Sequence, residues 1–120
     1  MGTSVLVVDD DPEFRRLARL LLTAAGLGVV GEAGTVADAT SAALALKPDA
    51  ALVDVGLPDG DGIALAGELA AMPWGLRVVL TSTNADAASP EDVRRSGAER
   101  FVPKADLATV SLPGLLAREQ

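Results

Sequence analysis

Short apolar runs alternate with helix-like stretches along this chain, and that alternation restricts the fold more than any other feature. The runs lie at Val5–Val8, Val29–Val30, Ala50–Val53, Arg77–Leu80 and Arg100–Val102. Aliphatic runs of this length without polar alternation are typical of strands covered on both faces. Strands that alternate with helices form parallel sheets, joined by right-handed crossovers. The sequence therefore predicts an α/β fold, a doubly wound parallel sheet built from five strand-helix units.

Capping residues predict where the helices begin and end. Asp11 before Pro12 starts the first helix, and Gly26 suits a left-handed helix end. Similar signals start the other helices, with Thr35 and Asp38, Ser89 and Asp92, and Ser111 before Leu112 to Glu119. The predicted buried face of the first helix consists of Phe14, Leu17, Ala18, Leu21 and Ala25. Pro103 predicts that the last strand lies at the sheet edge or ends there.

The composition excludes several classes of protein. The chain has 120 residues, 49% of them hydrophobic and 22% charged, which predicts one globular domain over residues 1–120. The absence of cysteine and histidine excludes disulfide scaffolds, thiolate metal sites and imidazole general bases. The net charge of -7 argues against direct nucleic-acid binding by this segment. Neither a membrane span nor a signal peptide is expected, so the predicted location is the cytoplasm.

Polar residues gather at the predicted carboxyl ends of the strands, where open parallel α/β sheets form their sites. Asp9 and Asp10 follow the first strand, and Asp54 ends the third. Thr81 follows the fourth strand and Lys104 the fifth. Crowded carboxylates repel one another, and oxygen-only ligands favour Mg²⁺ or Mn²⁺. A cation beside a lysine and a hydroxyl suits a phosphoryl group, which Asp54 could carry as an acyl phosphate.

These motifs resemble the receiver domain of bacterial two-component response regulators. Four segments carry the resemblance, in the family's order and at its spacing, and the resemblance as a whole extends over residues 4 to 118. They are Val5–Pro12, Asp54–Gly62, Val79–Ser82 and Phe101–Lys104. The resemblance implies a flavodoxin-like (βα)5 fold with strand order 2-1-3-4-5. It also implies that Asp54 accepts a phosphoryl group from the phosphohistidine of a sensor histidine kinase.

The resemblance further assigns roles to the residues around Asp54. Asp10 is expected to bind Mg²⁺ directly together with Asp54, Asp9 is expected to act through water, and the backbone carbonyl of Gly56 is expected to be a further ligand. Lys104 is expected to pair with the phosphate. Thr81 is expected to hydrogen-bond a phosphate oxygen and Phe101 to turn inward as the switch aromatic.

Three residues depart from the family pattern. Pro103, before the lysine, is a variation seen in some branches of the family. Ala105 stands where the family usually has proline after the lysine, and a cis bond before a non-proline residue is costly, which favours a trans Lys104–Ala105 bond. Gly56, two residues past Asp54, brings no side chain to the site. We therefore expect water to reach the acyl phosphate readily, giving a short-lived phosphorylated form.

Single motifs of this chain also fit other interpretations. Asp11 is expected to cap a helix, and Asp59-Gly60-Asp61-Gly62 is expected to form a turn with Asp61 near a helix start, since a calcium loop's glutamate and ligand spacing are missing. One alternative function is a Mg²⁺-dependent phosphohydrolase with an aspartyl-phosphate intermediate. That class usually has a second aspartate where this chain has Gly56, so the chain is expected not to turn over a substrate. The other alternative is a degenerate receiver that acts as a constitutive interaction module.

The output of the domain is inferred by analogy. The Phe101–Leu107 segment is similar to receivers that precede a DNA-binding helix-turn-helix domain, so the chain could be the N-terminal part of a transcriptional regulator. We expect the surface formed by Ser89–Gly97, Phe101 and Leu112–Glu119 to bind a partner or a second copy. No membrane partner is expected.

Overall fold

A five-stranded parallel sheet forms the centre of the protein, for which a computed structural model describes residues 2–117. The strands are β1 (Ser4–Val8), β2 (Gly28–Ala33), β3 (Ala50–Asp54), β6 (Arg77–Ser82) and β7 (Arg100–Pro103), in the spatial order β2-β1-β3-β6-β7. Because β6 and β7 are the fourth and fifth strands of this sheet, the predicted order 2-1-3-4-5 is confirmed. The strand that ends in Pro103 lies at one edge, as predicted.

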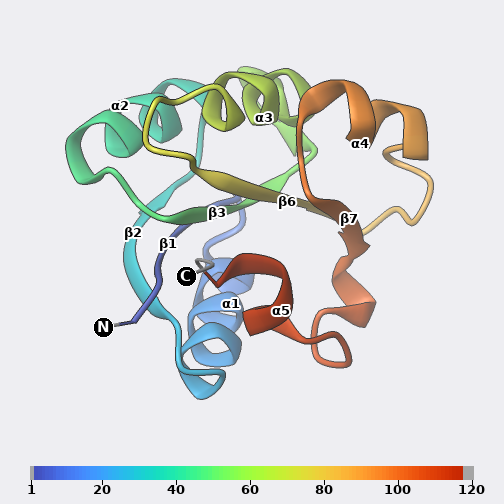
Figure 1. The fold of residues 1–120 in the computed structure, drawn as a ribbon. Helices are drawn as coiled ribbons and strands as arrows, with labels where there is room; N and C mark the ends of the chain where they lie inside the picture. The colour runs from blue at the N-terminus through green and yellow to red at the C-terminus, as the bar shows by residue number, and fades with distance from the viewer. Residues whose placement is uncertain (1, 118–120) are drawn as a thin grey trace.

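Helices cover both faces of the sheet, as Figure 1 shows. On one face lie α2 (Val36–Leu46), α3 (Gly62–Ala70) and α4 (Pro90–Ser96), and on the other lie α1 (Pro12–Ala24) and α5 (Leu112–Leu116). Alternate residues of a strand point to opposite faces. In β1, Leu6 and Val8 therefore join the core under α2 and α3, whereas Val5 and Val7 join the core over α1 and α5.

The predicted caps are confirmed. The side chains of Asp11, Thr35 and Ser89 each accept a backbone N–H in the first turn of α1, α2 and α4, respectively. Gly26 and Gly97 follow α1 and α4 in the left-handed conformation, with φ of 86° and 79°. Glycine adopts this conformation without the steric cost of a Cβ atom, which explains why both helices end there.

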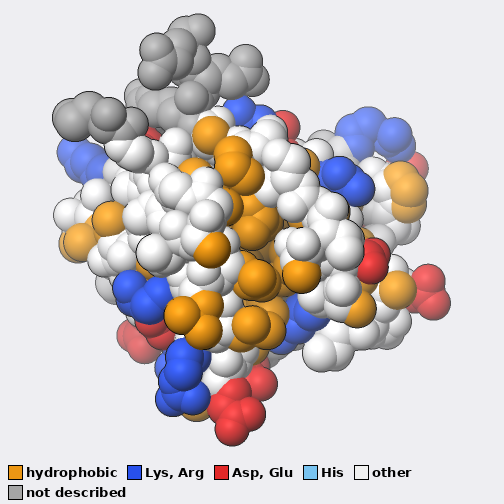
Figure 2. All heavy atoms as spheres, turned by 90° about the horizontal axis from the view of Figure 1, so that it is seen from below, with side chains coloured by type: hydrophobic (Ala, Val, Ile, Leu, Met, Phe, Trp, Pro, Cys, Tyr) orange, Lys and Arg blue, Asp and Glu red, His pale blue; other side chains and the backbone are white. Residues whose placement is uncertain are grey.

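The buried face of α1 differs from the prediction. Phe14 and Ala18 are buried as expected, but Leu22 completes the stripe, and Leu17 is 50% exposed. We attribute this to α5, which has only five residues and leaves part of α1 uncovered. Figure 2 shows a band of hydrophobic side chains over this face. Leu21 and Leu112 line a groove there between the two helices.

Three further details refine the prediction. α5 ends at Leu116, and Ala117 is extended, so the helix predicted to reach Glu119 is shorter; residues 118–120 lie outside the described part of the chain. The expected turn after Asp54 contains a two-residue antiparallel pairing of β4 (Gly56–Leu57) with β5 (Gly60–Asp61). The Lys104–Ala105 bond is trans, as favoured, and opens a 3₁₀ turn, η1 (Lys104–Asp106). Within residues 2–117, no helix has the length and apolar character needed to cross a bilayer.

Candidate functional site

The predicted site residues come together at one edge of the sheet. Asp9 directly follows β1, Asp54 ends β3, and Lys104 follows β7. Thr81 lies within β6, in register with Asp54 on the neighbouring strand. Parallel pairing therefore aligns the carboxyl ends of these strands and places side chains from distant parts of the sequence in one pocket.

Asp9 is fully buried and holds several groups in place. One carboxylate oxygen lies 2.6 Å from Nζ of Lys104, and the other accepts the backbone N–H of Asp11 at 2.9 Å. The Asp9 carbonyl accepts a hydrogen bond from the Arg15 guanidinium. A buried carboxylate requires such compensation, because removing an ion from water is costly. Asp9 thus ties Lys104 to the start of α1.

Lys104 occupies the space between three side chains. Its Nζ lies 2.6 Å from Asp9, 4.0 Å from Oδ2 of Asp54 and 4.0 Å from the centroid of the Phe14 ring. Its side chain is only 15% exposed. The ammonium group is therefore largely desolvated and lies close to the carboxylate predicted to receive phosphate.

Asp54 carries a carboxylate in an unfavourable environment. The residue is 7% exposed, and burial raises the pKa of its carboxyl group. The nearby Asp9 carboxylate raises this pKa further, whereas Lys104 and the Gly56 N–H, 3.4 Å from Oδ1, oppose the rise. A cation or a covalently attached group that compensates the charge is expected to be favoured here.

Three of the carboxylates could hold a metal ion together. Oxygen atoms of Asp9, Asp10 and Asp54 lie within 4.8 Å of one another, with Asp10 exposed and the other two buried. Oxygen-only donors suit a hard divalent cation such as Mg²⁺. The residues present therefore fit a divalent ion, which would be reached from solvent on the Asp10 side.

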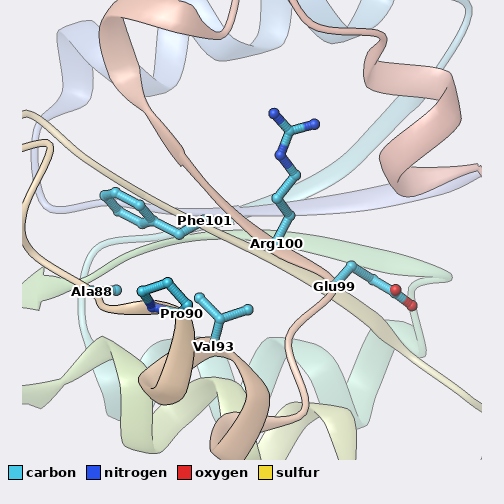
Figure 3. Close-up of a pocket in the computed structure, with 6 residues that line it drawn as sticks. All are labelled: Ala88, Pro90, Val93, Glu99, Arg100 and Phe101. Carbon is cyan, nitrogen blue, oxygen red and sulfur yellow. The ribbon is translucent and has the colours of Figure 1, made fainter.

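The Thr81 hydroxyl does not donate its hydrogen bond to Asp54. The residue is fully buried, and its hydroxyl donates to the carbonyl of Val102 at 2.7 Å. Phe101, the residue before Val102 in β7, is partly buried and lines a pocket of about 320 Å³ with Ala88, Pro90, Val93, Glu99 and Arg100 (Figure 3). The Thr81 hydroxyl is thus hydrogen-bonded to the backbone of β7, the strand that also carries Phe101.

Gly56 leaves open space beside Asp54. A Cβ atom built at Gly56 would have no neighbouring atom within 4 Å, and the residue is exposed. Gly56 belongs to the β4–β5 hairpin, whose turn contains Asp59. The Asp59 carboxylate ties this turn to the start of α2, where it accepts the backbone N–H groups of Val36 and Ala37 at 2.7 and 3.2 Å. The loop after Asp54 is therefore fixed at Asp59 and has room for a side chain at Gly56.

Sequence reasoning missed two residues of this region. Phe14 was assigned to the core, and its contact with Lys104 arises because the lysine side chain, which follows β7, extends to the first turn of α1, which no local signal reports. Asp59 was assigned to a turn, yet it caps α2 across a separation of more than twenty residues. The partial positive charge at a helix N-terminus favours a nearby carboxylate. It does not indicate which carboxylate of the chain will lie there.

The chain is similar to known signalling proteins. Residues 5–110 match the response regulator receiver domain family. The DNA-binding transcriptional activator DevR/DosR of Mycobacterium tuberculosis is 43% identical over 102 residues, which are 83% of this chain and 46% of that protein. The chemotaxis protein CheY of Thermotoga maritima is 30% identical over 104 residues, which are 87% of both proteins.

Solved structures agree with these matches. The receiver domain of the putative response regulator NarL from Mycobacterium tuberculosis has 30% sequence identity and a TM-score of 0.78, with 98% of each chain covered. The chain spans about half the length of the transcriptional regulators that it matches. Because the family match covers most of the chain and the acidic pocket is in place, this protein belongs to the response regulator receiver domain family.

Proposed function

We propose that the domain accepts a phosphoryl group on Asp54 from the phosphohistidine of a sensor histidine kinase. The observation that carries this proposal is the position of Lys104, 4.0 Å from Asp54 and 2.6 Å from Asp9 in a desolvated pocket. A carboxylate oxygen of Asp54 forms the new O–P bond as the P–N bond breaks. The imidazole, protonated on its other nitrogen, retains the bonding electron pair and leaves in neutral form.

The residues around Asp54 divide the work of binding the phosphoryl group. Lys104 supplies a fixed positive charge to its oxygens. Asp10 and Asp54, with the carbonyl of Gly56, would hold Mg²⁺, and Asp9 would orient it through water while also holding Lys104. The ion, when bound, would neutralise charge on the phosphoryl oxygens. Mn²⁺ is expected to substitute, because it shares the preference for oxygen ligands.

The switch is proposed to begin at Thr81. To reach a phosphoryl oxygen on Asp54, its hydroxyl must leave the Val102 carbonyl that it binds at 2.7 Å. Loss of this hydrogen bond would free β7 to adjust and allow Phe101 to turn inward beside α4. The phosphate would thereby favour one of two arrangements of the α4, β7 and α5 surface.

That surface is the proposed output face, either for a partner or for a second copy. Its α4 portion carries Glu91 and Arg94, which pair at 3.3 Å, so association is expected to depend on salt. Several matched relatives are named as transcriptional regulators and this chain spans about half of their length. We therefore propose that the domain controls transcription together with a DNA-binding domain, which is either part of the same protein or a separate partner.

The domain is proposed not to be a multiple-turnover enzyme. Gly56 offers no acid or base two residues after Asp54, and the chain contains no histidine. Its own chemistry would be limited to self-catalysed phosphorylation and dephosphorylation of Asp54. Gly56 argues against a phosphohydrolase, and the complete set of Asp10, Asp54, Thr81 and Lys104 at the strand ends argues against a degenerate receiver.

The test uses acetyl phosphate carrying radioactive phosphorus, with Mg²⁺. One label per chain is expected on Asp54, none after Asp54→Asn or with a chelator, and full label in the charge-matched control Asp61→Asn, which retains a helix-capping residue. Continuous release of phosphate from excess substrate would support a phosphohydrolase. Absence of label would support a degenerate receiver, and normal label in Asp54→Asn would exclude Asp54 as the acceptor.

A further inference from the structure

Phe14 has no reactive group, yet its side chain contacts Lys104 of the candidate site. It lies in the first turn of α1, is 8% exposed, and packs with the core under β1 and β7. The face of its ring lies under the ammonium group of Lys104, with Nζ 4.0 Å from the ring centroid. We propose that Phe14 is a positioning residue that acts through Lys104 in phosphoryl transfer, and this inference rests on the function proposed above.

The geometry explains why Lys104 needs a third contact. The lysine side chain has four rotatable bonds, so one ion pair alone leaves the ammonium group free to move. That ion pair is with Asp9 at 2.6 Å, while Asp54 lies at 4.0 Å. An aromatic face attracts a cation without accepting a conventional hydrogen bond. Phe14 therefore restricts the ammonium group while leaving N–H donors available for a phosphoryl oxygen on Asp54.

The position of the ring is tied to the same carboxylate that binds the lysine. Asp9 accepts the backbone N–H of Asp11, and Asp11 caps the first turn of α1 through Glu13. Phe14 is the next residue after Glu13. Asp9 thus fixes both the ammonium group and the helix turn that carries the ring, which gives the three groups one shared frame.

A purely structural role makes a different prediction, because any apolar side chain of similar size would then suffice. The discriminating experiment replaces Phe14 site-specifically with phenylalanines that carry one, two or three ring fluorines. Fluorine withdraws electron density from the ring face and weakens its attraction for a cation, with little change of shape. The measured quantity is the rate constant for labelling of Asp54 by acetyl phosphate at saturating Mg²⁺.

We expect the maximal rate constant to fall stepwise with each fluorine, reaching about a three- to tenfold loss with three fluorines and in Phe14→Leu. Phe14→Tyr, which keeps the ring, is expected to restore most of the rate. In a Lys104→Met background the series is expected to be flat, since the ring has no cation to hold. Leu22→Val, a change in the same helix and core, is expected to lower stability without changing the rate.

The outcomes separate this inference from the proposed function. A flat fluorine series in a protein that labels normally would overturn the inference and leave the function intact. So would an undiminished effect of Phe14→Leu in the Lys104→Met background. If the unmodified protein takes no label, the proposed function fails and the inference fails with it. As a direct measure of contact, Lys104 side-chain proton resonances should show a ring-current shift that Phe14→Tyr retains and Phe14→Leu loses.

Discussion

Aspartates occupy two contrasting regions of this domain, the pocket at the strand ends and the N-termini of the helices. In the pocket, Asp9 and Asp54 are buried beside each other, and burial raises the pKa of Asp54. At the helix starts, Asp59 and Asp92 accept backbone N–H groups in solvent, and these hydrogen bonds lower their pKa values. The same type of side chain thus has a destabilised charge in one region and a stabilised charge in the other, and the difference comes from its surroundings.

The contrast has a clear physical origin. A helix N-terminus offers several unpaired N–H donors that favour the ionised carboxylate, and at these exposed positions the hydrogen bonds outweigh the desolvation cost. The pocket instead withdraws water and supplies only Lys104 and a long hydrogen bond from Gly56. Metal binding or phosphorylation can therefore offset the unfavourable charge of a carboxylate in the pocket. A capping carboxylate already has hydrogen-bond partners that stabilise its charge.

The largest expected effect comes from removing the positive charge of the pocket. Lys104→Met should reduce the rate constant for phosphorylation of Asp54 by about a hundredfold, because a preorganised donor to the transferring group is lost. The measurement is quenched labelling with acetyl phosphate and Mg²⁺. Lys47→Met changes the other lysine, exposed at the end of α2, and should leave the rate unchanged. Equal rates in the two variants would contradict the assigned role of Lys104.

A smaller effect is expected from adding a side chain at Gly56, two residues after Asp54. Gly56→Asn should slow the loss of phosphate from Asp54 by roughly threefold or more, because the side chain excludes attacking water. The added side chain has room, since no atom lies within 4 Å of a Cβ at this position. Gly56→Ala controls for the backbone change. A decay rate that is unchanged or faster in Gly56→Asn would show that water access at this position does not limit the lifetime.

The third prediction compares stabilities in the absence of divalent cations. Asp54→Asn should raise the thermal unfolding midpoint, because it removes a buried charge that Asp9 repels. Added Mg²⁺ should narrow the difference, since an ion that binds only the folded wild type stabilises it. Calorimetry with a chelator and then with Mg²⁺ provides the measurement. A lower midpoint for Asp54→Asn in chelator would mean that its ion pair outweighs the burial cost.

The smallest effect concerns the capping region and its pH dependence. The folded pKa of Asp59 lies below the ordinary value of 3.8 because of its hydrogen bonds from Val36 and Ala37. Its carboxylate therefore contributes stability above that ordinary value, and the contribution is lost as the pH falls through the folded pKa. Asp59→Ala should destabilise the protein at neutral pH, and the difference from wild type should shrink below pH 3.8.

Urea unfolding followed by the fluorescence of Trp74, the chain's single tryptophan, measures this difference. Asp86→Ala removes an exposed aspartate in the loop before α4 and is the charge-matched control. A difference between wild type and Asp59→Ala that stays constant down to the acid limit would show that the charge of Asp59 contributes nothing. Comparable destabilisation by Asp86→Ala would indicate a general charge effect.

Much of the fold was predictable because its signals are local. Val5–Val8 is apolar throughout and forms a strand buried on both faces, and Asp11, Thr35 and Ser89 cap the helices that they precede. The buried face of α1 was only partly predictable. Helical periodicity permits several neighbouring stripes, and the packing of α1 in the core with β1 buries Leu22 while Leu17 stays half-exposed.

The candidate site was predictable to the level of its members but not of its contacts. Strand ends of a parallel sheet must meet, which places Asp9, Asp54 and Lys104 near one another from order alone. The sequence did not indicate that Asp9 is the closest partner of Lys104, nor that the Thr81 hydroxyl binds Val102. These choices depend on side-chain rotamers and on sub-ångström strand positions, which local patterns do not report.

What the sequence determined by itself is therefore the order of strands and helices and the set of polar residues at the strand ends. Those features follow from periodicity, capping and chain connectivity, each of which acts over a few residues. Only the tertiary structure decided that Phe14 lies against Lys104 and that Asp59 caps α2. Contacts between residues far apart in the chain depend on how whole layers pack, because a small rotation of one helix exchanges the side chains that meet.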